Sequence, residues 1–129
     1  MSRVKYSKDH EWVKLDDAGN ALVGITFYAQ KQLGDVVYVE LPESGRTLQQ
    51  DENAAVVESV KAASDVKAPI GGSVLEINPQ LNDHPEIVNS DPMGSGWFMK
   101  LSPANPSELD QLMDETAYNS YLKTLGYEE

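Results

Sequence analysis

Short segments rich in β-branched residues, separated by residues that favour turns, are the feature of this sequence that most restricts its fold. Strands favour such runs, and turn formers at this spacing are typical of small all-β domains. The strand-like runs are residues 21–26, 36–41, 54–58, 64–68 and 73–77, and the turn signals are residues 16–20, 42–45 and 69–72. We therefore expect a mainly β fold, a small sandwich or flattened barrel of short antiparallel strands.

Two kinds of helical signal accompany the strands. Residues 26–33 contain helix formers and stop at Gly34, which predicts a short internal helix on the sheet. After residues 97–101, the expected last strand, Ser107 and Asp110 have the spacing of a capping box. The helix that it would open runs through Leu109, Leu112 and Met113.

A second C-terminal helix is indicated by apolar residues three and four positions apart. Gly126 stands where a helix C-cap belongs. Because such a stripe is the general mark of a buried face, we expect it to pack against the sheet and not to hold a cofactor. The apolar positions of this face are Tyr118, Tyr121, Leu122 and Leu125.

Length and charge limit the classes of protein to consider. The 129 residues suffice for one compact domain, residues 1–129, with core strands at about 4–101 and a helical segment at about 107–126. The formal net charge of -11 disfavours nucleic acid and anionic membranes as partners. The same charge fits either plain solubility or the steering of docking partners.

Absent sequence features narrow the chemistry further. The chain has no cysteine, which excludes disulfides, thiolate metal ligands and a cysteine nucleophile. The amino terminus lacks the apolar stretch of a signal peptide, and no run of about 18 apolar residues occurs. We expect a cytoplasmic protein.

Lys61 is the residue best placed to carry a covalent group. Residues 54–58 and 64–68 read as two strands joined by small residues, so Lys61 lies near the tip of a predicted hairpin. Ala62 and Ala63 leave its amine open to an enzyme that delivers an activated acid. Acylation would extend the side chain into a tether with a high effective concentration at successive active sites. A lysine in a turn is, however, ordinarily just a solvated side chain.

Residues 58–65, ESVKAASD, resemble the lipoylation motif of the glycine cleavage H-protein family, in which the lysine is lipoylated. The resemblance extends from about residue 5 to residue 125 and implies a lipoyl-carrier or biotinyl-carrier-like sandwich with added helices, which agrees with the pattern above. Four further blocks resemble the same family in the same order: residues 10–13, residues 24–26 with 29–30 and 33–35, residues 39–42, and residues 96–97 with Lys100.

The resemblance implies a function and a set of partners. Lipoic acid bound covalently to Lys61 would carry the aminomethyl group of glycine from a pyridoxal-phosphate glycine decarboxylase to a tetrahydrofolate-dependent aminomethyltransferase. Dihydrolipoamide dehydrogenase would reoxidise it, and a lipoate-attaching enzyme would install it. The protein would be a non-catalytic component of this system, a monomer and, in a bacterium, cytoplasmic.

The resemblance also implies a docking cleft for the arm, lined by Glu11, Asp65 and Ile25. Carboxylates would hold the ammonium group of a loaded arm, and a cleft would shield its labile carbon from water. By residue type, Glu11 and Asp65 are equally well ordinary surface carboxylates. Glu58, three residues before Lys61, is either a recognition residue for the attaching enzyme or a solvent-facing strand residue.

One departure from the family pattern concerns the expected cleft. Phe27 stands where an acidic residue is common in the family. An exposed Phe27 would suggest a partner contact and a buried one would suggest packing.

Competing interpretations are weaker. Biotin carriers share the expected fold, but their lysine is typically flanked by Met, whereas Val60 and Ala62 flank Lys61 here. An H-like protein that relays lipoyl groups, or a binding module without a glycine cleavage role, stays open. A small hydrolase using His10 with the two carboxylates lacks a nucleophile or a metal set. His10 and His84 do not have the spacing of a metal pair, so we expect no metal site.

Overall fold

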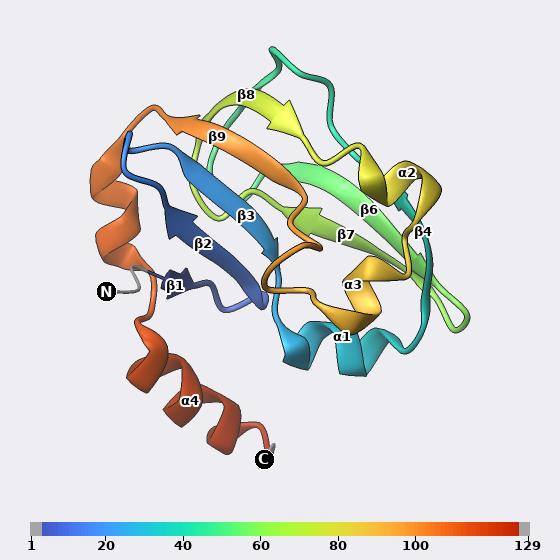
Figure 1. Ribbon diagram of the computed structural model, residues 1–129. Coiled ribbons are helices and arrows are strands. Elements are labelled where there is room, and N and C mark those ends of the chain that lie inside the picture. Colours follow the sequence, from blue (N-terminus) through green and yellow to red (C-terminus); the bar gives the residue numbers. More distant parts are fainter. Residues whose placement is uncertain (1–3, 127–129) are drawn as a thin grey trace.

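The computed structural model describes residues 4–126 and consists of two antiparallel sheets with helices at their edges (Figure 1). The larger sheet has the order β1 (Val4–Tyr6), β2 (Glu11–Leu15), β3 (Ala21–Ile25), β9 (Met99–Pro103), β8 (Gly72–Ile77) and β5 (Thr47–Leu48). The smaller sheet has the order β4 (Val36–Glu40), β6 (Asn53–Ser59) and β7 (Ala63–Lys67). The predicted mainly β sandwich is confirmed.

A shared hydrophobic core holds the two sheets together. Val13 and Val23 of the larger sheet belong to the same buried cluster as Val39, Val57 and Val66 of the smaller one. Alternate strand residues point to one face, so most strands contribute between one and three buried apolar side chains to this layer. Burying them supplies the main favourable free energy for packing the sheets.

The internal helix forms where the sequence predicts it. Thr26 caps α1 (Phe27–Leu33) by accepting a hydrogen bond from the Ala29 backbone N–H at 3.3 Å. Gly34 follows the helix with a φ of 83°, a conformation that only glycine adopts without strain. In Figure 1, α1 lies close to α3 (Ile87–Ser90), while α2 (Gln80–Asp83) follows β8 near β4. Neither α2 nor α3 was predicted from the sequence.

Near the C-terminus one sequence prediction is confirmed with shifted bounds and another is wrong. The last strand is Met99–Pro103, shifted toward the C-terminus from residues 97–101. Residues Pro106–Gln111 form a 3-10 helix (η1), and its cap is Asn105, whose side chain accepts hydrogen bonds from the N–H and the hydroxyl of Ser107. Ser107 is therefore not an N-cap. The helix also ends before Met113, which instead forms a β-bridge with Tyr6.

The last helix, α4 (Glu115–Thr124), packs on the outside of β1 and β2 as a second cluster. Tyr118 stacks on Tyr6 with ring centroids 4.5 Å apart, and Leu122 is buried beside them. Leu125 is exposed, so the predicted apolar face is narrower than its sequence pattern indicates. Gly126 follows the helix with a φ of 86°, which confirms its predicted place at the helix end.

Candidate functional site

Lys61 lies in the tight connection between β6 and β7, as the sequence predicts. Ser59 closes this turn: its N–H donates to the Ala62 carbonyl at 2.8 Å, and its hydroxyl oxygen accepts from the N–H groups of Lys61 and Ala62 at 3.1 Å. A serine hydroxyl thus satisfies backbone groups that the turn leaves unpaired. Lys61 is exposed, and among the described residues no salt bridge engages its amine.

The hairpin tip is attached to the segment that follows α1. The Val60 N–H donates to the Asp35 carbonyl at 3.0 Å. The Lys61 side chain lies over Gly34, because a methyl group placed on Gly34 would be 3.1 Å from the Lys61 Cε. The tip therefore has a defined position against residues 34–35, although its lysine stays open to solvent.

Asn89 of α3 fixes the support beneath the tip. Its Oδ1 accepts from the Val36 N–H at 2.8 Å and its Nδ2 donates to the Val36 carbonyl at 3.2 Å, as a neighbouring strand would. Gln30 of α1 donates both to Asn89 Oδ1 and to the Gly34 carbonyl, each at 3.2 Å. This brace satisfies backbone groups at the edge of β4 that would otherwise be open to another chain.

Glu11 is buried, and the interpretation of it as an ordinary surface carboxylate is wrong. Only 3% of its surface is exposed. The Ser7 hydroxyl donates to its carboxylate at 2.5 Å, and the Glu11 N–H donates back to the Ser7 oxygen at 3.0 Å. Burial raises the pKa of Glu11 to about 7, against the opposing effects of the Ser7 hydrogen bond and of Lys67. Ile25, its cross-strand partner, is buried as well.

Asp65 and Glu58 lie in a different environment from Glu11. Both are exposed, and both belong to the outer face of the smaller sheet, since Asp65 is paired with Val56 and Glu58 with Tyr38. The structure thus presents Asp65 to solvent close to the hairpin tip along β7, while Glu11 is enclosed at the beginning of β2. The two proposed cleft carboxylates do not share one surface environment.

The two histidines have structural and surface settings. His10 has a φ of 70°, its Nδ1 shares a 2.8 Å hydrogen bond with the Tyr118 hydroxyl, and burial lowers its pKa. Tyr118 also bonds the Thr26 hydroxyl at 2.8 Å. His84 is exposed and lies 3.1 Å from Glu86. Over residues 4–126, no cluster of three potential His, Asp or Glu ligands is found.

Phe27 is exposed and lines a groove beside α4. The groove has a volume of about 700 Å³ and is also lined by Tyr28, Met93 and Tyr118. Exposure here favours the partner-contact interpretation of Phe27 over internal packing. In the part of the chain that the structure describes, no helix is long and apolar enough to cross a membrane.

Three residues of the site were missed by sequence reasoning or given a smaller role. Ser7 carries only a weak local signal, a hydroxyl four residues before a carboxylate, since the burial of Glu11 is not visible in the sequence. Gly34 is visible in the sequence only as a helix stop. Asn89 has no local signal, since its partner Val36 lies 53 residues away.

A family model described as glycine cleavage H-protein matches residues 4–125. The glycine cleavage system H protein of Methylocella silvestris is 58% identical over 126 residues, covering 98% of this chain and 100% of that protein. The one from Rhodospirillum rubrum is 54% identical over 125 residues, covering 97% and 99% of the two chains.

A solved structure agrees with these sequence matches. The crystal structure of a glycine cleavage system H protein from Mycobacterium marinum superposes with a TM-score of 0.83 at 34% identity, over 96% of this chain and 97% of that one. Fold, length and sequence coincide over nearly the whole chain. This protein therefore belongs to the glycine cleavage H-protein family.

Proposed function

We propose that this protein is the lipoyl carrier of a glycine cleavage system, with lipoic acid attached through an amide bond to Lys61. The observation that carries the proposal is an exposed lysine at the tip of a braced hairpin in a chain of this family. When bound, the lipoyl group supplies a dithiolane that can be reduced and can carry the aminomethyl group of glycine.

The residues around Lys61 fit such a group. The small side chains of Ala62 and Ala63 are exposed beside the amine, so an enzyme can approach it without displacing bulky neighbours. Ser59 fixes the turn, and the Asp35 carbonyl accepts a hydrogen bond from the Val60 N–H. The base of the tether is therefore positioned, while the far end of the tether remains free. A positioned base and a mobile end are what a carrier needs to serve successive active sites.

The proposed partners follow from this role. The carrier passes its aminomethyl cargo from the pyridoxal-phosphate decarboxylase to the tetrahydrofolate-dependent aminomethyltransferase, and dihydrolipoamide dehydrogenase reoxidises the dithiol. A lipoate-attaching enzyme modifies Lys61, with Glu58 as a recognition residue. The chain itself acts as a single, monomeric, non-catalytic carrier domain.

Glu11, Asp65 and Ile25 are proposed to receive the loaded arm. Asp65 offers an exposed carboxylate for an ammonium group, and Glu11 with Ile25 provides a region from which water is excluded. Asp65→Asn should then speed the release of ammonia and formaldehyde from the loaded carrier, measured in the absence of the partner enzymes. Equal decay rates for wild type and variant would remove Asp65 from this role.

The test of the proposed function is peptide mass mapping after incubation with lipoate, ATP and a lipoate ligase. A lipoyl mass is expected on the peptide that contains Lys61. It should be absent in Lys61→Arg, which keeps the charge, and present in the control Lys67→Arg, which alters a lysine of the same hairpin. A folded wild type that stays unmodified, or is modified at another lysine, would contradict the proposal.

A further inference from the structure

Three exposed apolar side chains gather beside Lys61. Val60 at the tip is 70% exposed, and Val37 and Tyr38 of β4 are 54% and 49% exposed. In the pairing of β4 with β6, Val36 lies opposite Ser59 and Tyr38 lies opposite Glu58. Because Val60 directly follows Ser59, the three exposed apolar side chains all lie near the hairpin tip. Large apolar groups clustered on a surface mark a contact site more reliably than single ones do.

A β-bulge produces this exposure. Regular alternation along β4 would turn one of two successive residues inward, but Val36 and Val39 are both buried and the two residues between them are both exposed. The register of β4 against β6 shifts between Val36 and Tyr38, which is the one-residue insertion of a bulge. Because of the bulge, Val37 and Tyr38 are both exposed to water, whereas a regular strand would turn one of them inward.

Carboxylates surround the apolar cluster on the same face. Glu58 is the cross-strand partner of Tyr38, and Glu40 and Asp65 are the partners of Val56 on either side. Residues that pair across an antiparallel sheet share a face. None of these three carboxylates enters a salt bridge with another described residue. The face therefore combines an apolar centre with unpaired negative charge.

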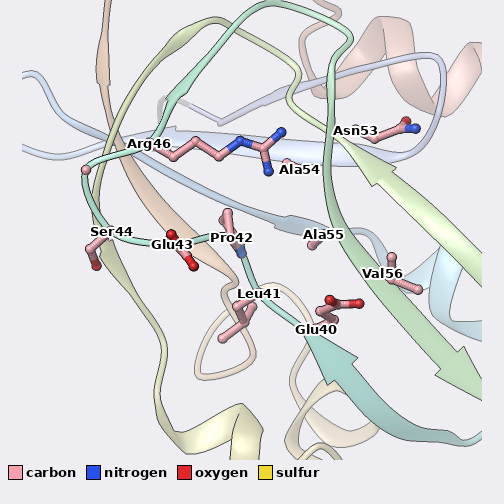
Figure 2. Close-up of a pocket in the computed structure, with 11 residues that line it drawn as sticks. Glu40, Leu41, Pro42, Glu43, Ser44, Arg46, Asn53, Ala54, Ala55 and Val56 are labelled. Carbon is pink, nitrogen blue, oxygen red and sulfur yellow. The ribbon is translucent and has the colours of Figure 1, made fainter.

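A groove lies where β4 and β6 separate, at the end of the sheet away from the hairpin tip. β4 ends at Glu40 and the chain then leaves β6, which opens a cavity of about 800 Å³ between residues 41–46 and residues 53–56 (Figure 2). Figure 2 shows Glu40 and Val56 together at one end of this groove, where the strands still pair.

We propose that the outer face of the β4–β6–β7 sheet is the docking surface for the enzyme that acylates Lys61, and that the enzyme meets it with apolar side chains framed by Lys and Arg. This inference rests on the proposed modification of Lys61. Opposite charges across an interface favour encounter and orientation, and the three unpaired carboxylates define a cationic complement.

Distance selects the attaching enzyme among the proposed partners. An enzyme that forms an amide with the Lys61 amine must bring its own active site to the hairpin tip, where Val37, Tyr38 and Val60 lie. Enzymes that use the finished arm reach its far end and can dock elsewhere. The sequence indicates only Glu58 for recognition, whereas the fold adds Tyr38 opposite it and the bulged Val37.

The test measures ligase kinetics with the whole protein as the varied substrate. Val37→Thr and Val60→Thr keep the side-chain shape but replace one exposed methyl group with a hydroxyl, and Tyr38→Thr removes the exposed ring while keeping a strand-forming residue. Leu75→Thr is the matched control, because Leu75 is 44% exposed on β8 of the other sheet. The combined triple variant should raise KM about fivefold or more with kcat nearly unchanged, since each lost contact weakens docking and not chemistry.

A second arm of the test addresses the charge. Glu40→Gln should raise KM and reduce the dependence of kcat/KM on salt, because a screened attraction has been removed. If the ligase modifies wild type at Lys61 and the triple variant shows the same KM as wild type, the proposed docking surface is overturned. The proposed function then stays intact. An equal effect of Leu75→Thr, or a loss confined to kcat, would also overturn the docking surface. A wild type that is never modified at Lys61 would instead defeat the proposed function.

Discussion

The side chain of Lys61 lies against the backbone of Gly34, across the gap between the hairpin tip and the end of α1. A Cβ at Gly34 would approach the Lys61 Cε to 3.1 Å, closer than an ordinary van der Waals contact. The φ of 83° at Gly34 is itself a glycine conformation. One residue therefore ends the helix and leaves room for the stem of the proposed carrier arm.

Gly34→Ala should disturb both features. We expect a loss of about 1–3 kcal/mol in the free energy of unfolding, because a φ of 83° with a ψ of -155° lies in a region that essentially only glycine adopts. The Cε resonance of Lys61 should also shift in NMR spectra, because the new methyl group displaces the side chain.

Gly19→Ala is the matched control for Gly34→Ala. Gly19 has a similar φ of 85°, and a Cβ there would meet no atom within 4 Å. It should lose stability to a similar extent and leave the Lys61 resonance in place. An unchanged Lys61 resonance in Gly34→Ala would show that the two residues are not in contact in solution.

Glu11→Gln should change how stability depends on pH. Burial raises the pKa of Glu11 from 4.5 to about 7, so between these values the folded protein keeps a proton that the unfolded chain has released. The contribution of the protonated Glu11 to the free energy of unfolding is fully present below pH 4.5 and is lost as the pH rises to about 7. Relative to Glu11→Gln, which cannot titrate, wild type should lose up to about 3 kcal/mol over this range.

Urea unfolding of the two proteins at a series of pH values measures this difference, and other titrating groups cancel in the comparison. Ser7→Ala supplies a further check. Because the Ser7 hydrogen bond lowers the pKa of Glu11, its removal should move the loss of stability to higher pH. Parallel pH curves for wild type and Glu11→Gln would contradict the raised pKa.

Asn89→Ala should loosen the support of the hairpin. The substitution leaves the N–H and the carbonyl of Val36 without their side-chain partner, at a cost of about 1–3 kcal/mol. Amide hydrogen exchange should accelerate at Val36 and at Val60, whose N–H depends on the position of Asp35. Asn82→Ala, an exposed position on α2, is the control and should change neither amide. Unchanged exchange at Val36 would argue against the brace.

Tyr118→Phe should separate stacking from hydrogen bonding in the second cluster. The ring that stacks on Tyr6 is kept, while the hydroxyl that bonds Thr26 and His10 is lost. We expect unfolding to become easier by about 1–3 kcal/mol, because the buried Thr26 hydroxyl loses a partner. Tyr121→Phe removes only a 3.4 Å contact to the Lys8 carbonyl and should change stability by less than about 0.5 kcal/mol. Equal effects of the two variants would show that the Tyr118 hydroxyl contributes little.

Local sequence signals predicted most of the elements around the site. The strands β3, β4, β6, β7 and β8 and the helix between Thr26 and Gly34 follow from periodicity, capping and glycine placement, which act over a few residues. The two-residue strand β5 was not predicted. The C-terminal capping box was wrong because the helix begins before Ser107, at Pro106, and the Asn105 side chain accepts hydrogen bonds from both the N–H and the hydroxyl of Ser107. The extent of the last apolar face was wrong because burial of Leu125 depends on where α4 packs.

The sequence by itself determined the mainly β class of fold, the hairpin with Lys61 near its tip and the family resemblance, since these depend on residue order and short-range preference. Only the tertiary structure decided that Glu11 is buried, that Asn89 substitutes for a strand beside Val36 and that a bulge exposes Val37 with Tyr38. The physical reason is that burial and edge pairing depend on residues distant in the chain. Such partners leave no mark in the local pattern until the sheets pack.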